Sequence, residues 1–158
     1  MPPTNLQRMI DLVQRVFDTR NDPSQISVSR RTMIRLSNIH PATLTERKTA
    51  AGPIAWILIF PTTKRLMELF LQKKISEKVL LKRTPLGKPY DSIYLCSALV
   101  LPEYRKRGIA KRLMVRAVKA IAKDHPIQFL FYWSFSRAGK QLSLSVAKEV
   151  GLPILRRK

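Results

Sequence analysis

Apolar residues along this chain fall into two patterns, continuous runs and runs spaced as on one face of a helix. The continuous runs predict buried strands at residues 54–60, at residues 92–101 and from Ile127 onward. Helical spacing predicts helices at residues 6–17, from Gly108 onward and at residues 137–150. Because strands and helices alternate, the pattern indicates an α/β fold.

Turn-forming and capping residues bound these elements. Thr4 and Gln7 have the spacing of a capping box, Pro61 and Pro102 are expected to end the two central strands, and Gly151 is a natural C-cap. The sequence leaves the secondary structure of residues 24–50 open. The segment "ISVSRRTMIRL" fits a strand or a helix, and "HPATLTERKTAAGP" fits a loop or a short polar edge strand.

Between the two central strands, residues 62–84 carry two short helical patterns. Thr62 or Thr63 can cap the first, and Ser76 can cap the second. The C-terminal "LPILRR" adds a possible short strand. Because the chain shows no internal repeat and no low-complexity linker, we predict a single domain over residues 1–158.

Composition narrows the class of protein. Apolar residues make up 45% of the 158 residues, which suits a globular fold. The longest apolar run, Ile54–Phe60, is too short to cross a bilayer, and the N-terminus lacks the pattern of a secretion signal. Cys96 is the only cysteine, so no internal disulfide can form. These features predict a cytoplasmic protein without a membrane segment.

Charge is the most unusual bulk property, because the formal net charge is +20. A field of this sign attracts phosphates, nucleic acids and acidic proteins, and it would favour neutral or acidic substrates. The basic residues are spread along the chain rather than gathered in a tail. Association with nucleic acid or the ribosome therefore stays open but is not favoured.

The segment "LVLPEYRKRGIAKRL" places basic residues between a predicted strand and a predicted helix. The free amides of a helix N-terminus bind phosphate, and the small residues Gly108 and Ala110 let the backbone approach an anion closely. The segment lacks both the Walker pattern and the dinucleotide fingerprint. The basic side chains around this turn are Arg105, Lys106, Arg107 and Lys111.

The stretch "RKRGIA", with the strand before it and the helix after it, resembles the acetyl-CoA loop of the GNAT (Gcn5-related N-acetyltransferase) superfamily. The resemblance is close over residues 92–134. It implies a mixed, mostly antiparallel central sheet flanked by helices, with residues 62–84 as a helical insertion placed later than is usual in the family. It also implies that the chain uses acetyl-CoA (coenzyme A).

The resemblance assigns the cofactor-binding positions to two short stretches. The backbone of Ala98, Leu99 and Val100 would pair with the pantetheine arm, and an amide near Val100 or Leu101 would polarise the thioester carbonyl. The amides from Lys106 to Lys111 would hold the pyrophosphate. The full expected set is Ala98, Leu99, Val100, Leu101, Arg105, Lys106, Arg107, Gly108, Ile109, Ala110 and Lys111.

No catalytic residue is assigned. If Gly151 and Leu152 stand for the family's "GF" pair, its tyrosine and asparagine positions hold Ala147 and Lys140, so the usual general acid is missing. The predicted strand before the loop contains no glutamate. The alternatives in and near the predicted strands, each more readily a structural residue, are Asp91, Tyr94, Ser97 and Tyr132.

The remaining reactive side chains favour structural roles. His40 and His125 precede prolines and are interpreted as loop residues, and no His/Cys pair has metal-ligand spacing, so no metal site is expected. Trp56, Trp133 and Cys96 fall in predicted strands and are interpreted as core. Glu103 and Tyr104 are expected to shape the turn before the loop.

Three functions follow from these observations. The first is an acetyl-CoA-dependent N-acetyltransferase that acts on an amine of a small molecule or a protein. The second is a basic nucleic-acid-binding or ribosome-associated module. The third is a GNAT-fold acyl-CoA binder without transfer activity. Neither the acceptor nor the oligomeric state follows from the sequence.

Overall fold

A five-stranded sheet organises the chain. The computed structural model describes residues 2–20, 26, 29–134 and 136–158, without the side chains of residues 17–20. The strands lie in the order β1-β2-β3-β4-β5. Their bounds are β1 Leu44–Thr49, β2 Gly52–Thr62, β3 Ser92–Val100, β4 Phe129–Tyr132 and β5 Ile154–Arg156. The pairs β1/β2 and β2/β3 are antiparallel and the longest, and β3/β4 and β4/β5 are parallel.

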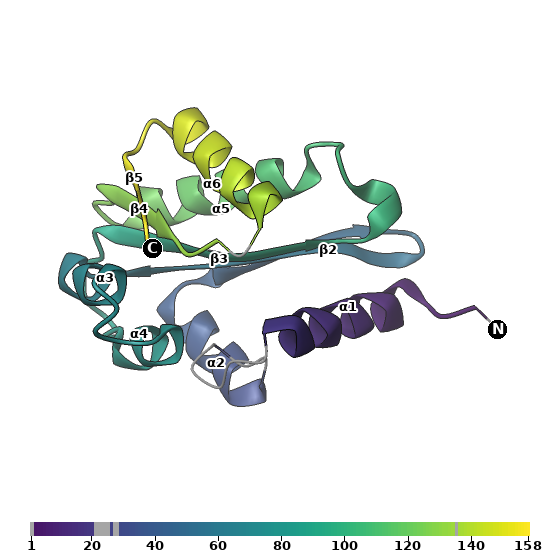
Figure 1. The fold of residues 1–158 in the computed structure, drawn as a ribbon, viewed down its shortest axis with the longest axis horizontal. Coiled ribbons are helices and arrows are strands. Elements are labelled where there is room, and N and C mark those ends of the chain that lie inside the picture. Colours follow the sequence, from purple (N-terminus) through teal and green to yellow (C-terminus); the bar gives the residue numbers. More distant parts are fainter. Residues whose placement is uncertain (1, 21–25, 27–28, 135) are drawn as a thin grey trace.

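Helices cover both faces of the sheet (Figure 1). On one face lie α5 (Ile109–Asp124) and α6 (Arg137–Val150). On the other face lie α1 (Asn5–Arg20), α2 (Arg30–Ile39), α3 (Lys64–Leu71) and α4 (Glu77–Arg83). Two core clusters form, one built largely on α5 and joined by Met9 and Leu12 of α1, and the other on the aromatic rings of Phe60, Phe70, Tyr94 and Phe131. The expected mixed sheet with flanking helices is confirmed.

The segment that the sequence left open resolves into a helix and a strand. Residues of "ISVSRRTMIRL" form α2, which Ser29 caps by accepting the Thr32 amide, and the polar edge strand is β1. Pro61 does not end its strand as expected, because β2 continues to Thr62. Pairing with β1 stops at Leu58, so one edge of β2 is unpaired at Pro61, where a residue without an N–H is tolerated.

The expected helical insertion is confirmed as α3 and α4, capped by Thr63 and Ser76. At the start of α4 the Glu77 side chain is buried. Its two carboxylate oxygens accept the Ile26 amide at 3.1 Å and the Tyr94 hydroxyl at 2.5 Å. Glu77 therefore joins α4, the central strand and the segment before α2 through one buried acceptor.

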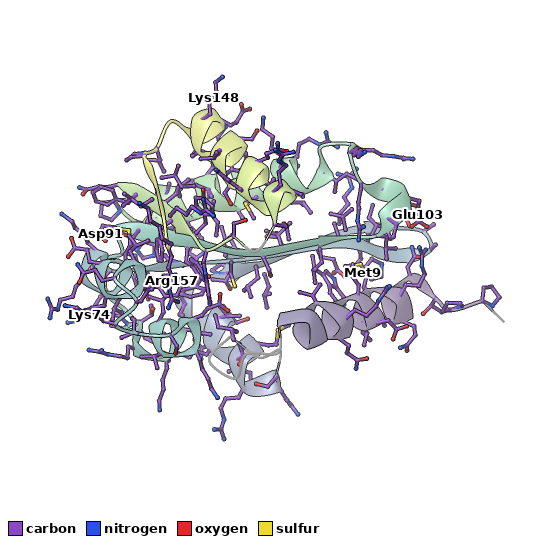
Figure 2. The ribbon with its side chains drawn as sticks, viewed as in Figure 1. Met9, Lys74, Asp91, Glu103, Lys148 and Arg157 are labelled. Atoms are coloured by element: carbon purple, nitrogen blue, oxygen red, sulfur yellow. The ribbon has the colours of Figure 1, made fainter. Side chains whose placement is uncertain are left out.

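Helix α1 is fixed at its N-terminal end to the turn that follows β3. Thr4 caps the helix by accepting the Gln7 amide at 3.1 Å, but the Gln7 side chain bonds Asp11, so the capping box is only half formed. Arg8 makes a two-pronged ion pair with Glu103, at 2.8 and 2.6 Å. Glu103 lies in the short 3-10 turn η2 (Pro102–Tyr104), and Figure 2 shows it at the same end of the molecule as the start of α1.

His40 is a buried cap rather than a plain loop residue. Its Nδ1 accepts the Ala42 amide at 3.0 Å, and its Nε2 lies 2.7 Å from the Asp124 carboxylate at the end of α5. The His125 ring lies tilted against the Tyr90 ring, with the ring centroids 4.7 Å apart, and burial lowers the pKa of His125. In the part of the chain that the structure describes, no helix is long and apolar enough to span a membrane.

We expect Glu77→Ala to lower the free energy of unfolding by about 2–4 kcal/mol, because the buried Ile26 amide and Tyr94 hydroxyl lose their common acceptor. Chemical denaturation measures this. The control Glu68→Ala removes a half-exposed carboxylate of α3 and should cost under about 0.5 kcal/mol. Equal effects of the two substitutions would contradict the role of Glu77.

We also expect a carboxyl titration by NMR to find Glu103 with a pKa of about 2, because the hydrogen bond from Arg8 favours its charged form. The lowered pKa means that this group stabilises the fold above its ordinary pKa of 4.5, and that the contribution is lost as pH falls toward 2.

The variant Arg8→Gln should return the Glu103 pKa toward 4.5. Lys148→Gln removes the same charge from α6, away from Glu103 in Figure 2, and should leave that pKa in place. If the pKa of Glu103 stays the same in the Arg8→Gln variant, the ion pair does not form in solution.

Candidate active site

The parallel strands β3 and β4 are paired along all of β4 but along only the first half of β3. Pairing between β3 and β4 ends at Leu95 and Tyr132, whereas β3 continues along β2 as far as Val100. The β2/β3 register skips Cys96, so a β-bulge lies where the separation begins. From Ser97 to Val100, the edge of β3 that faces away from β2 has no strand partner among the described residues.

The hydrogen-bond alternation of β3 shows which groups face this opening. Leu101 donates its amide to the Ile54 carbonyl of β2 at 2.9 Å. Successive residues of a strand point their amides to opposite sides, so Val100 and Ala98 direct theirs away from β2 and toward the gap. The Val100 carbonyl accepts Nε of Arg105 at 2.9 Å, which agrees with this direction. The Leu101 amide is therefore already used, and the Val100 amide faces the gap.

A cavity of about 540 Å³ lies at the gap, between β3, β4, α1, α5 and the start of α6. We call it the α6 cavity. Its strand wall runs from Leu95 to Val100, and Tyr132 and Trp133 line it from β4 and just beyond. Arg105, Ala110 and Gly139 also line it. Trp133 was interpreted from the sequence as a core residue, but it is only partly buried and also lines this cavity.

The loop before α5 has the geometry of an anion-binding turn, and we call it the anion-binding loop. Gly108 is the N-cap of α5 in the left-handed conformation, at φ +75°, and it provides no side-chain cap. The first amides of α5 are therefore free to bind a ligand. Lys106 is also left-handed, at φ +63°. Arg107 stacks over the Tyr104 ring at 5.4 Å, so Tyr104 shapes the loop as expected.

A second cavity continues from this turn along the outer face of α5. It has a volume of about 560 Å³, and we call it the α5 groove. Four basic side chains and one acidic side chain line it, namely Lys111, Arg112, Arg116, Lys119 and Glu149. An anion in this groove meets several positive groups beside a helix N-terminus.

A third cavity lies on the opposite face of the sheet. The α2 cavity, of about 550 Å³, is enclosed by α1, α2 and the three strands β1, β2 and β3. Most of its lining is apolar, and Trp56, interpreted from the sequence as core, forms part of its wall. Ser97 and Leu99 line both the α2 cavity and the α6 cavity, so β3 is the partition between them.

The candidate reactive residues divide by position. Asp91 precedes β3 at the opposite end of the molecule from Glu103 in Figure 2, and its backbone carbonyl accepts the amides of Gln128 and Phe129. The Tyr94 hydroxyl is used by Glu77. Ser97 and Tyr132 line cavities, although Tyr132 is almost fully buried. No three metal-ligating side chains cluster within the described residues.

Two contributions to the site were missed in the sequence. Helix α1 lines both cavities, with Leu12, Arg15 and Val16 facing the α6 cavity and Ile10, Val13 and Gln14 facing the α2 cavity. Among the described residues that line the α2 cavity, Glu46 of β1 supplies the carboxylate. The apolar positions on more than one face of α1 were an available signal, whereas the polar sequence of β1 offered none.

Comparison with known proteins places the chain in a family. The model of the acetyltransferase (GNAT) family matches residues 34–141. No curated protein sequence matches the chain. Among solved structures, Naa20 of Chaetomium thermophilum in complex with a bisubstrate analogue aligns at 16% identity and a TM-score of 0.42. That alignment covers 66% of this chain and 48% of the Naa20 chain, so this chain spans about half of its length.

A second similar structure is an aminoglycoside acetyltransferase, meta-AAC0020, from an uncultured soil metagenomic sample, in complex with trehalose. It aligns at 10% identity and a TM-score of 0.48, over 92% of this chain and 80% of that chain. The family match runs from α2 into α6 and so includes the diverging strands and the anion-binding loop. The resemblance predicted from the sequence is confirmed: this chain belongs to the GNAT family of acetyltransferases.

Proposed function

We propose that this protein transfers an acetyl group from acetyl-CoA to the nitrogen of an amine. The observation that carries the proposal is the opening between β3 and β4. The unpaired edge of β3 lies there between a cavity that leads to the anion-binding loop and a cavity on the opposite face. A donor and an acceptor bound in these two cavities would meet beside Ser97 and Leu99.

The described residues fit acetyl-CoA, which when bound supplies an activated acetyl thioester. The gap-facing amide and carbonyl of Ala98, beside Leu99, would hydrogen-bond the pantetheine arm as an added strand does, and the Val100 amide would face the thioester. The amides of Ile109, Ala110 and Lys111 would hold the pyrophosphate at the start of α5. Arg105, Lys106 and Arg107 surround that turn, and the α5 groove would take the remaining phosphate.

The amide of Val100 is suited to polarise the thioester carbonyl. It points into the gap and is held in place by β3, so it needs no rearrangement when negative charge develops on the oxygen. The expected alternative, Leu101, is not available because its amide donates to Ile54. Leu101 is instead a buried residue that fixes the end of the strand.

The acceptor amine would enter through the α2 cavity. An alkylamine is protonated at neutral pH, because its pKa is about 10.4, and it must lose a proton before its nitrogen can attack. Asp91 and Tyr94 are excluded as direct bases by their positions and partners. The proton would leave through water in the α2 cavity, and no side chain is assigned as the general base.

We expect Gly108→Asp to weaken CoA binding by at least about tenfold, because it places a side chain and a negative charge where the pyrophosphate would lie. Calorimetry with CoA measures this. Gly151→Asp is a matched control, since Gly151 caps α6 at φ +72° with open space around it. Equal CoA affinity of both variants and the unchanged protein would contradict the loop assignment.

Transfer itself is tested by release of the CoA thiol from acetyl-CoA in the presence of a panel of primary amines. Thiol release that depends on both the amine and Gly108 supports the proposal. Saturating CoA at about 100 times its Kd should also stabilise the fold by about 2.7 kcal/mol. Stabilisation by CoA without amine-dependent release would indicate a binder without transfer activity, and stabilisation by a short RNA alone would favour the nucleic-acid alternative.

A further inference from the structure

The α2 cavity has a mostly apolar lining with a few polar side chains. Leu44, Leu58 and Leu99 of the sheet and Met33 and Leu36 of α2 supply apolar lining. The described lining contains no lysine or arginine, although the formal net charge of the chain is +20. Its volume of about 550 Å³ is in the range of small-molecule sites.

Glu46 is placed at a fixed distance from the strand that separates the two cavities. It pairs with Trp56 across β1/β2, and Trp56 pairs with Leu99 across β2/β3. Residues that are directly paired in a sheet point to the same face, so all three face the α2 cavity. Adjacent strands lie about 4.8 Å apart, so the backbone of Glu46 lies about 10 Å across the sheet from that of Leu99.

The Glu46 carboxylate is held in place but keeps acceptor capacity. Its Oε1 accepts the Trp56 indole N–H at 3.0 Å, and its Oε2 lies 3.6 Å from Nζ of Lys48. Lys48 is mostly exposed, so this ion pair is weak. The Glu46 side chain is 35% exposed, which places it at the mouth of the cavity rather than in its interior.

We propose that Glu46 determines acceptor specificity: it selects small amines that carry a second hydrogen-bond donor, an ammonium or a hydroxyl, remote from the attacked nitrogen. This inference rests on the proposed function, which puts the attacked nitrogen beside β3. The backbones of Glu46 and Leu99 are about two strand spacings apart. A single amine group therefore cannot contact Glu46 and attack the thioester at the same time, so a second donor group is needed to reach Glu46. The apolar surface between the two points fits a hydrocarbon body.

The experiment uses four amines of matched length: heptylamine and its ω-hydroxy, ω-amino and ω-carboxylate derivatives. We expect kcat/KM of the unchanged protein to be about tenfold higher for the hydroxy and amino forms than for heptylamine, and lowest for the carboxylate. A hydrogen bond to a charged group is sufficient for a tenfold preference. Calorimetry of the same amines with the CoA-bound protein gives the preference independently of transfer.

Three variants test the assignment. Glu46→Gln should remove the preference for the ω-amino form, and Glu46→Lys should make the ω-carboxylate the best of the four. A residue that only supports the fold would not reverse a charge preference. The control Glu68→Gln removes the same charge from the exposed side of α3 and should leave the order unchanged. Because Glu46 lies at an exposed edge strand, we expect its variants to fold.

The outcomes separate this inference from the proposed function. If the unchanged protein acetylates or binds the amines with preferences that Glu46→Gln and Glu46→Lys leave in place, the role of Glu46 is overturned. If a short peptide with a free α-amine is acetylated far faster than all four amines, the small-amine class is overturned. If neither thiol release nor CoA binding occurs, the proposed function itself fails.

Discussion

The site depends on one unequal pairing: β3 stays bonded to β2 along its whole length but loses β4 after Leu95. Buried backbone groups need hydrogen-bond partners, so an unpaired strand edge inside a fold favours a ligand that provides them. The bulge at Cys96 allows this separation without breaking the β2/β3 ladder. The aromatic core beneath the paired half, with Tyr94 stacked on Phe131 at 5.0 Å, keeps the separation from spreading to the other end of the strands.

Helix α1 contributes to the walls of both cavities beside β3, so its position over the sheet shapes each of them. The buried side chains of Met9 and Leu12 pack α1 into the core, and Arg8 fixes its start to Glu103. Because η2 leads directly into the anion-binding loop, the same ion pair ties the helix to that loop. A change in the position of α1 therefore alters both cavities and the loop together. The α6 cavity and the α2 cavity thus share one helix in their walls.

The sequence predicted the parts of the site that are contiguous. The loop, its glycine and the helix that follows lie within a dozen residues, so local rules of helix capping were sufficient to predict where α5 begins. The fate of residues 24–50 was not predictable, because "ISVSRRTMIRL" satisfies two periodicities and only packing of Leu36 and Ile39 decides between them. Pro61 was misjudged because its tolerance depends on where the neighbouring strand ends.

Other parts of the site depend on contacts between distant segments. Glu46 faces a cavity only because β1 pairs with β2 in one register, and the sequence of a polar edge strand does not specify that register strongly. The same holds for Arg8 and Glu103, which are close only in the fold. The sequence around His40 was also a poor guide to its role. The His40 side chain is buried where it meets Asp124 at the end of α5, and not by residues of its own loop.

The positive charge of the chain is therefore distributed unequally between the α5 groove and the α2 cavity. At the α5 groove it is local, since four basic side chains line the cavity that would receive phosphates. At the α2 cavity no lysine or arginine belongs to the described lining, although Lys48 lies 3.6 Å from the Glu46 carboxylate at its mouth. An amine in that cavity meets apolar side chains and the carboxylate of Glu46, with no described basic side chain in its lining. Under the proposed function, the local lining of the α2 cavity rather than the net charge would govern the binding of an amine there.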